Sequence, residues 1–102
     1  MKRKVLVKIH KSYRNVVAVC DSDLIGKKFE EDKFQLDLKE SFYKGDEMSE
    51  EEAENIMRHM LREDATFNIV GKKSINAALK AEIISQDSVG EIKNVPFALV
   101  LG

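Results

Sequence analysis

Two short runs rich in β-branched residues, separated by a brief polar link, constrain the fold of this chain most strongly. The runs cover Lys4–His10 and Asn15–Asp21, and together they hold five valines and one isoleucine. β-branched side chains favour extended backbone, and a link this short permits only a tight reversal between two strands. The sequence therefore predicts an antiparallel hairpin in the first part of the chain.

A turn centred on Tyr13 and Arg14 would pair Val7 with Cys20. This register gathers an apolar set on one face of the hairpin: Val5, Val7, Ile9, Val16, Ala18 and Cys20. A slip of one residue would mix the two faces, so the uniform apolar set favours this register. We therefore expect Cys20 in the core, where apolar surroundings raise the pKa of a thiol and make it inert.

Further along the chain, the spacing of apolar residues changes from strand-like to helix-like. Alternation predicts a third, half-exposed strand over Phe34–Leu38. Ser49 and Glu52 form a capping box, which begins a helix that ends near Asp64. The short apolar run Phe67–Val70 predicts a buried strand.

The last third of the chain predicts a second helix over Ser74–Ile84, a short strand around Val89–Ile92 and a terminal strand over Phe97–Leu101. We expect an α+β fold in a single domain of 102 residues. An antiparallel N-terminal hairpin or meander would precede a β-α-β portion with a right-handed parallel crossover. The sheet would be mixed, and its two helices would form a single layer on one face.

The charges of the chain are unevenly distributed. Six basic residues and no acidic residue precede Cys20, whereas Glu40–Asp64 holds nine acidic and three basic residues. The net charge of −1 hides this polarity. A positive end on a nearly neutral protein favours a phosphate-rich partner.

The predicted hairpin turn is the first candidate site. Lys8 and His10 lie on its mixed face, and Lys11, Tyr13 and Arg14 lie at the turn. The tyrosine ring can stack on a base while the cations hold phosphates, which is typical of RNA-binding surfaces. The alternative is an ordinary solvated hairpin end.

The second candidate site is the joint Gly71-Lys72-Lys73-Ser74, where a strand passes into a helix. Free N–H groups, the helix dipole and two lysines favour an anion there. The joint lacks the longer glycine-rich run of a P-loop, and the alternative is a turn glycine before a serine-capped helix. Two further loops are candidate sites. The first combines glycine with Lys27 and Lys28. The second combines lysine with Tyr43, and its alternative is a loop that the neighbouring Phe42 anchors in the core.

The composition disfavours several other classes of site. The single cysteine excludes an internal disulfide framework and a cysteine-rich zinc site. No cluster has metal-ligand spacing, so we expect no metal and no cofactor. No apolar run suits a signal peptide or a membrane span, which predicts a cytoplasmic protein. The oligomeric state is left open.

Several strings of the sequence together carry a family resemblance. They are Val7–Ser12, Val16–Asp21, Leu24–Phe29, Phe42-Tyr43, Asn68–Gly71 and Asn94–Pro96. In this order they resemble the archaeal family catalogued as domain of unknown function 424. The resemblance implies a cytoplasmic archaeal protein with a compact mixed fold, no established activity and a link to RNA or translation.

The chain departs from the family pattern at two positions. Phe97 follows Pro96 where the pattern has histidine, and Lys44 takes a glycine position. Phe97 cannot replace a catalytic histidine, which argues against an enzyme built on that position.

Three hypotheses about function follow. The first is a non-enzymatic module that binds RNA or a ribonucleoprotein, for which the basic hairpin and the Gly71–Ser74 joint should adjoin. The second is a small-anion binder or enzyme that combines the Gly26–Lys28 loop, the Gly71–Ser74 joint and Asp21 or Asp23. The third is a protein-interaction subunit that uses the acidic helix or the Phe97–Leu101 sheet edge.

Overall fold

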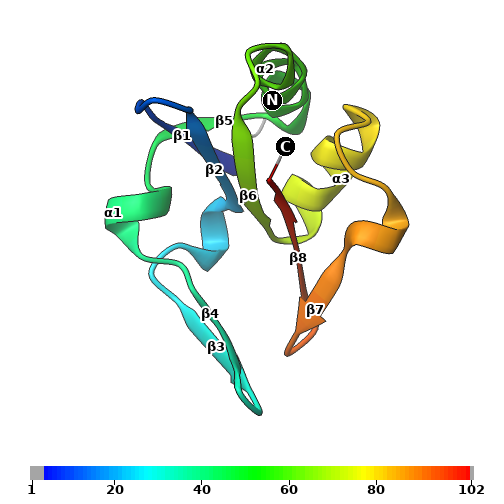
Figure 1. Cartoon of the computed structure of the whole chain (residues 1–102). Helices are drawn as coiled ribbons and strands as arrows, with labels where there is room; N and C mark the ends of the chain where they lie inside the picture. Colours follow the sequence, from blue (N-terminus) through cyan, green and yellow to red (C-terminus); the bar gives the residue numbers. More distant parts are fainter. Residues whose placement is uncertain (1–3, 102) are drawn as a thin grey trace.

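The computed structural model describes residues 4–101, so Lys2 and Arg3 of the basic N-terminal segment lie outside the described residues. A mixed six-stranded sheet has the order β5-β1-β2-β6-β8-β7 (Figure 1). Its strands are β1 (Val5–His10), β2 (Val16–Asp21), β5 (Asp46–Met48), β6 (Thr66–Val70), β7 (Gly90–Ile92) and β8 (Val95–Val100). The remaining strands, β3 (Lys28–Glu31) and β4 (Phe34–Asp37), form a separate hairpin. The α+β fold class and the mixed sheet are confirmed.

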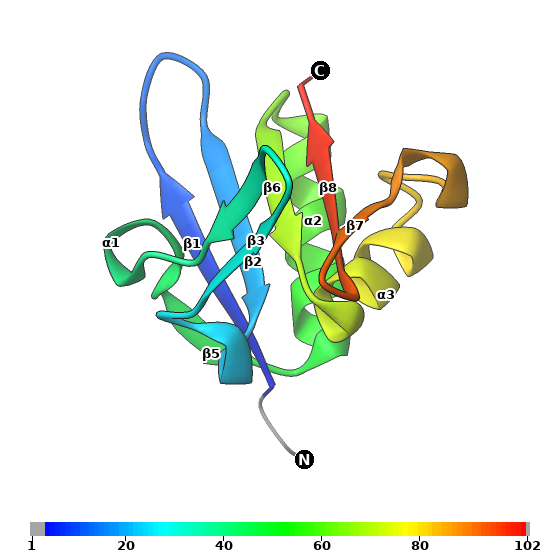
Figure 2. The ribbon, with the colours of Figure 1, turned by 90° about the horizontal axis from the view of Figure 1, so that it is seen from below.

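The helices are α1 (Glu40–Tyr43), α2 (Glu50–Arg62) and α3 (Lys72–Lys80), with 3-10 turns η1 (Ser22–Leu24) and η2 (Gln86–Ser88). The two longer helices, α2 and α3, cover one face of the sheet, as predicted. The one-turn helix α1 and the β3–β4 hairpin lie on the opposite face (Figure 2). Both faces of the sheet are therefore covered.

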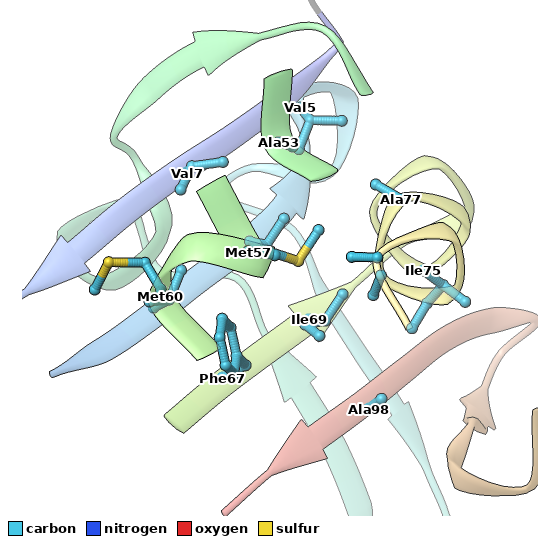
Figure 3. Packing of buried hydrophobic residues seen from close by; sticks show 14 of the residues in the cluster. Val5, Val7, Ala53, Met57, Met60, Phe67, Ile69, Ile75, Ala77 and Ala98 are labelled. Atoms are coloured by element: carbon cyan, nitrogen blue, oxygen red, sulfur yellow. The ribbon is translucent and has the colours of Figure 1, made fainter. Parts of the chain in front are cut away.

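The larger core lies between the sheet and the helices α2 and α3 (Figure 3). Met57 of α2 and Phe67 of β6 are fully buried within it. The capping box of α2 is confirmed: the Glu52 N–H donates to Ser49 Oγ at 3.1 Å, and the Ser49 N–H donates to the Glu52 carboxylate at 2.9 Å. This cap fixes the start of the helix that carries Met57 into the core.

The predicted register of the first hairpin is wrong by one residue. Val7 pairs with Val19 rather than Cys20, and His10 pairs with Val16. The reason is that both faces are buried, because Leu6, Ala18 and Cys20 pack into a second cluster beneath α1 and the β3–β4 hairpin. An apolar set on one face therefore cannot select the register.

The predicted parallel β-α-β crossover at the end of the chain is also wrong. β6 and β8 are antiparallel, and the parallel neighbours are β2 and β6. A two-residue turn at Lys93 and Asn94, with φ of 51° and 65°, reverses the chain between β7 and β8. Positive φ at both central residues suits the twist of a tight hairpin. The predicted third strand is β4, which pairs with β3 instead of joining the sheet.

Candidate ligand cleft at the ends of two parallel strands

The parallel strands β2 and β6 end at the same edge of the sheet. Cys20 pairs with Val70, so Asp21 and Gly71 follow side by side, and α3 begins immediately after Gly71. In open sheets, ligands bind in the crevice outside the carboxyl ends of parallel strands. A binding site is therefore expected at this edge of the sheet.

The carboxylate of Asp21 binds the first turn of α3. Its Oδ2 accepts the Lys73 N–H at 3.1 Å, and its Oδ1 accepts the Ser74 N–H at 2.9 Å and the Ser74 hydroxyl at 2.8 Å. Asp21 and Ser74 are both buried. The N–H groups of Lys73 and Ser74, which were expected to bind an external anion, thus donate to the Asp21 carboxylate instead.

Gly71 makes this contact possible. Its φ of +110° is a conformation that other residues rarely adopt, and a Cβ there would collide with the Asp21 carboxyl group. Gly71 and Asp21 therefore form one structural unit that joins β2 to α3.

Two adjoining depressions open around this unit. The first, of about 240 Å³, is lined by Asp21, Asp23, Leu24, Gly71, Lys72, Lys73, Asn94, Val95 and Pro96. The second, of about 220 Å³, is lined by Lys4, Ser22, Asp23 and Lys73. Because they share Asp23 and Lys73, we treat them as one site, the strand-end cleft.

The strand-end cleft contains unpaired positive charge. Among the described residues, the ammonium groups of Lys4, Lys72 and Lys73 have no ion pair or hydrogen bond. The charge of Asp21 is already stabilised by its three hydrogen bonds, whereas Asp23 is exposed. Ser22 Oγ is buried and has no hydrogen-bond partner in the described part of the chain. Lysines and a free hydroxyl are suitable ligands for a phosphate group.

The structure places much of the predicted basic hairpin surface in internal contacts. Lys8 Nζ donates to the Ser41 carbonyl at 3.0 Å. His10 Nε2 is 2.8 Å from the Phe42 carbonyl, and its ring stacks on the Phe42 ring with centroids 4.6 Å apart. These two side chains hold α1 against β1.

The turn itself is divided between paired and free residues. Arg14 donates from Nε to the Asp64 carbonyl at 2.8 Å and from Nη2 to the Asp64 carboxylate at 2.9 Å. Lys11 is exposed, and Tyr13 is fully exposed. Within the described part of the chain, only these two side chains of the predicted turn surface remain available to a partner.

Other predicted site residues do not line the strand-end cleft. Lys27 and Lys28 are exposed near β3, where Lys28 Nζ is 3.8 Å from the Glu30 carboxylate. Tyr43 is buried in the second cluster, and burial raises its pKa to about 12. Desolvation similarly raises the pKa of the Cys20 thiol to about 12, which supports the inert-thiol prediction.

The two predicted basic segments do not adjoin. The hairpin turn precedes Val16, which pairs with Thr66, whereas the Gly71–Ser74 joint follows the pairing of Cys20 with Val70. They therefore lie at opposite ends of β2 (Figure 1). The prediction of one continuous basic surface is therefore wrong. The structure does bring Asp21 and Asp23 together with Lys72 and Lys73, as the small-anion hypothesis expects.

Lys4, Ser22 and the Asn94–Pro96 segment were missed as members of the site. The signal for Asn94–Pro96 was its place among the familiar strings, since Asp21 and Gly71 belong to two others. The tight β7–β8 turn brings the third string to the first two. Among the described residues, no three histidine, cysteine or carboxylate side chains form a group suited to a metal ion. No described helix has the length and apolar character that a membrane span needs.

Comparisons with known proteins agree with this fold. The profile of the family described as "Protein of unknown function (DUF424)" matches residues 10–102. A crystal structure of an uncharacterized conserved protein from Methanopyrus kandleri is 27% identical, with a TM-score of 0.86, over 95% of this chain and 90% of that one. No curated protein matches the chain.

Proposed function

The chain belongs to the DUF424 family, and we propose from the geometry that it binds a small phosphate-bearing molecule in the strand-end cleft. The observation that carries the proposal is the position of Lys73, which lines both depressions and has no ion-pair partner among the described residues. Lys4 and Lys72 add positive charge from either side. This proposal keeps the small-anion hypothesis but removes Lys27 and Lys28 from the site.

The shape of the cleft favours a ligand with a phosphate at one end. Lys4 and Lys73 line the second depression, whereas Leu24, Val95 and Pro96 supply apolar surface in the first. A ligand of this kind would place its phosphate near Lys73 and its remaining part against Leu24 and Pro96. The nearest thiol, Cys20, is neutral and buried, so we propose binding rather than covalent catalysis.

Calorimetric titration with a nucleoside monophosphate and with inorganic phosphate tests this proposal. A hydrogen bond to a charged group contributes about 1.5–3 kcal/mol, so Lys73→Met should weaken binding by roughly tenfold or more. Lys80→Met is the matched control, because Lys80 is an exposed lysine at the other end of α3. Equal affinity in the two variants, or no binding by the unaltered protein, would contradict the proposal.

A second candidate function is RNA binding at the hairpin turn. It is favoured by the complete exposure of Tyr13 beside the exposed Lys11. Arg14 is unsuitable for a test because its substitution would also break the contact with Asp64. A cytoplasmic location is part of both proposals.

Fluorescence anisotropy with labelled transfer RNA tests this second candidate. Affinity should fall with salt, because Lys11 releases counterions when it contacts a phosphate. The double variant Lys11→Glu, Tyr13→Ala should lose binding, whereas Lys33→Glu, at the tip of the β3–β4 hairpin, should not. Unchanged binding in the double variant would exclude this surface.

A further inference from the structure

The last strand in the chain is β8. On the side that faces β7, it is paired over only part of its length. The three residues of β7 lie opposite Val95–Phe97. On the other side, β6 lies opposite Phe97–Val100. Beyond Phe97, no described strand pairs with β8 on the side of β7, so this part of β8 is an open edge of the sheet.

The backbone groups at this open edge can be identified. The Gly71 N–H donates to the Pro96 carbonyl at 2.8 Å, so the polar groups of Pro96 face β6. Because the backbone N–H and C=O groups of successive residues point to opposite sides of a strand, the backbone groups of Ala98 and Val100 also face β6. The polar backbone groups of Leu99 therefore point to the open edge, as does the N–H of Leu101, the residue that follows β8, and none of these groups has a described backbone partner.

Exposed apolar side chains accompany these backbone groups. Leu99 is 55% exposed and Leu101 is 73% exposed. Leu99 also lines an apolar groove of about 290 Å³ together with Phe34 of β4, which is 68% exposed. Hydrogen-bonding backbone beside exposed apolar side chains is the surface that an added strand covers.

The other edges of the sheet carry charges that oppose strand addition. Asp46 and Glu47 lie on β5, and Glu91 lies on β7. By contrast, the segment from Val95 to Leu101 contains no charged residue. Natural proteins protect exposed edges with charges, so the unprotected part of β8 is expected to be covered by another strand.

We propose that this open edge pairs with the same edge of a second copy of the chain. Antiparallel pairing about Val100 places Leu99 of each copy opposite Leu101 of the other, so exposed leucines meet one another and no charges are brought together. Each such pair can exchange two hydrogen bonds. The arrangement is two-fold symmetric and closed.

The position of β7 limits the length of this interface. β7 already occupies the same side of β8 up to Phe97, so the second copy can pair only with the residues beyond it. The segment Leu99–Leu101 therefore supplies the edge groups for this pairing. A second copy thus covers Leu99 and Leu101 and joins two sheets into one.

Light scattering coupled to size-exclusion chromatography, from micromolar to millimolar protein, tests the proposal. We expect a concentration-dependent rise from 11.6 kDa to twice that mass. Leu99→Lys should keep the protein monomeric, because it places charges on both sides of the two-fold axis. Leu61→Lys, at an exposed leucine of α2, should dimerise like the unaltered chain.

Disulfide formation at the two-fold axis is an independent readout if Leu99→Lys does not fold. Residues of a non-hydrogen-bonded antiparallel pair have Cα atoms about 4.5 Å apart, a separation that a disulfide spans. Val100→Cys should therefore form a covalent dimer on mild oxidation, and Leu61→Cys should not. A monomer at every concentration, or a dimer that neither Leu99→Lys nor Val100→Cys affects as described, would overturn the proposal.

Discussion

At the scale of the residue, the contact between Asp21 and the start of α3 explains most of the local structure at the strand-end cleft. Asp21 accepts three hydrogen bonds, and Gly71 is required because any side chain there would meet the carboxyl group. A strand-to-helix joint with glycine, lysines and serine was predictable from the sequence. The carboxylate that fills it comes from a residue about fifty positions earlier, which no local pattern indicates.

Asp21→Ala should lower the free energy of unfolding by roughly 1–3 kcal/mol, because buried donors of Lys73 and Ser74 lose their acceptor. Urea denaturation measures this change. Asp23→Ala is the control and should have almost no effect, since Asp23 is exposed. Equal losses in the two variants would show that Asp21 does not hold the joint.

The buried thiol and phenol predict how stability depends on alkaline pH. Burial raises the pKa of Cys20 from 9.0 to about 12 and that of Tyr43 from 10.0 to about 12. Both groups therefore ionise earlier in the unfolded chain, so stability is complete below pH 9 and falls as pH rises toward 12. Urea midpoints measured across this window should decline less steeply in Cys20→Ala, and an identical decline would contradict the assignment.

At the scale of the element, the sequence predicts segments better than it predicts their pairing. Ser49 and Glu52 correctly predicted the start of α2, because a capping box is a local sequence pattern. The register of the first hairpin was wrong because Leu6 and Cys20 are buried on the face opposite Val7. When both faces of a sheet are covered, apolar alternation carries little information about register.

Ser49→Ala should reduce the free energy of unfolding by about 1 kcal/mol, the usual contribution of an N-cap side chain. The expected cause is loss of the bond between the Glu52 N–H and Ser49 Oγ. Thermal unfolding monitored by circular dichroism measures the change, and Ser49→Asp, which retains a capping acceptor, should lie close to the unaltered protein. A large loss in Ser49→Asp would instead point to the burial of this position.

At the scale of the whole molecule, the uneven charge of the sequence is partly used within the fold. The acidic segment passes around the basic hairpin: β5 pairs with β1, α1 accepts a hydrogen bond from Lys8, and Asp64 binds Arg14. The sequence could not show this, because it depends on which segments meet in three dimensions. Lys4, Lys72 and Lys73 remain unpaired among the described residues, and they surround the strand-end cleft.

This arrangement shifts the expected binding site from one end of β2 to the other. The basic turn lies beside Thr66, at the start of β6, whereas the strand-end cleft lies beyond Val70, at its end. The distinction is useful because amide signals from the two ends report on them separately.

Amide NMR spectra recorded during titration with a nucleoside monophosphate test the central claim most directly. We predict that the largest shifts fall on Ser22, Asp23, Lys72, Lys73 and Asn94, which line the strand-end cleft. The signals of Lys11 and Tyr13 should stay unchanged. Shifts confined to the hairpin turn, or no shifts at the cleft at saturating ligand, would contradict the account.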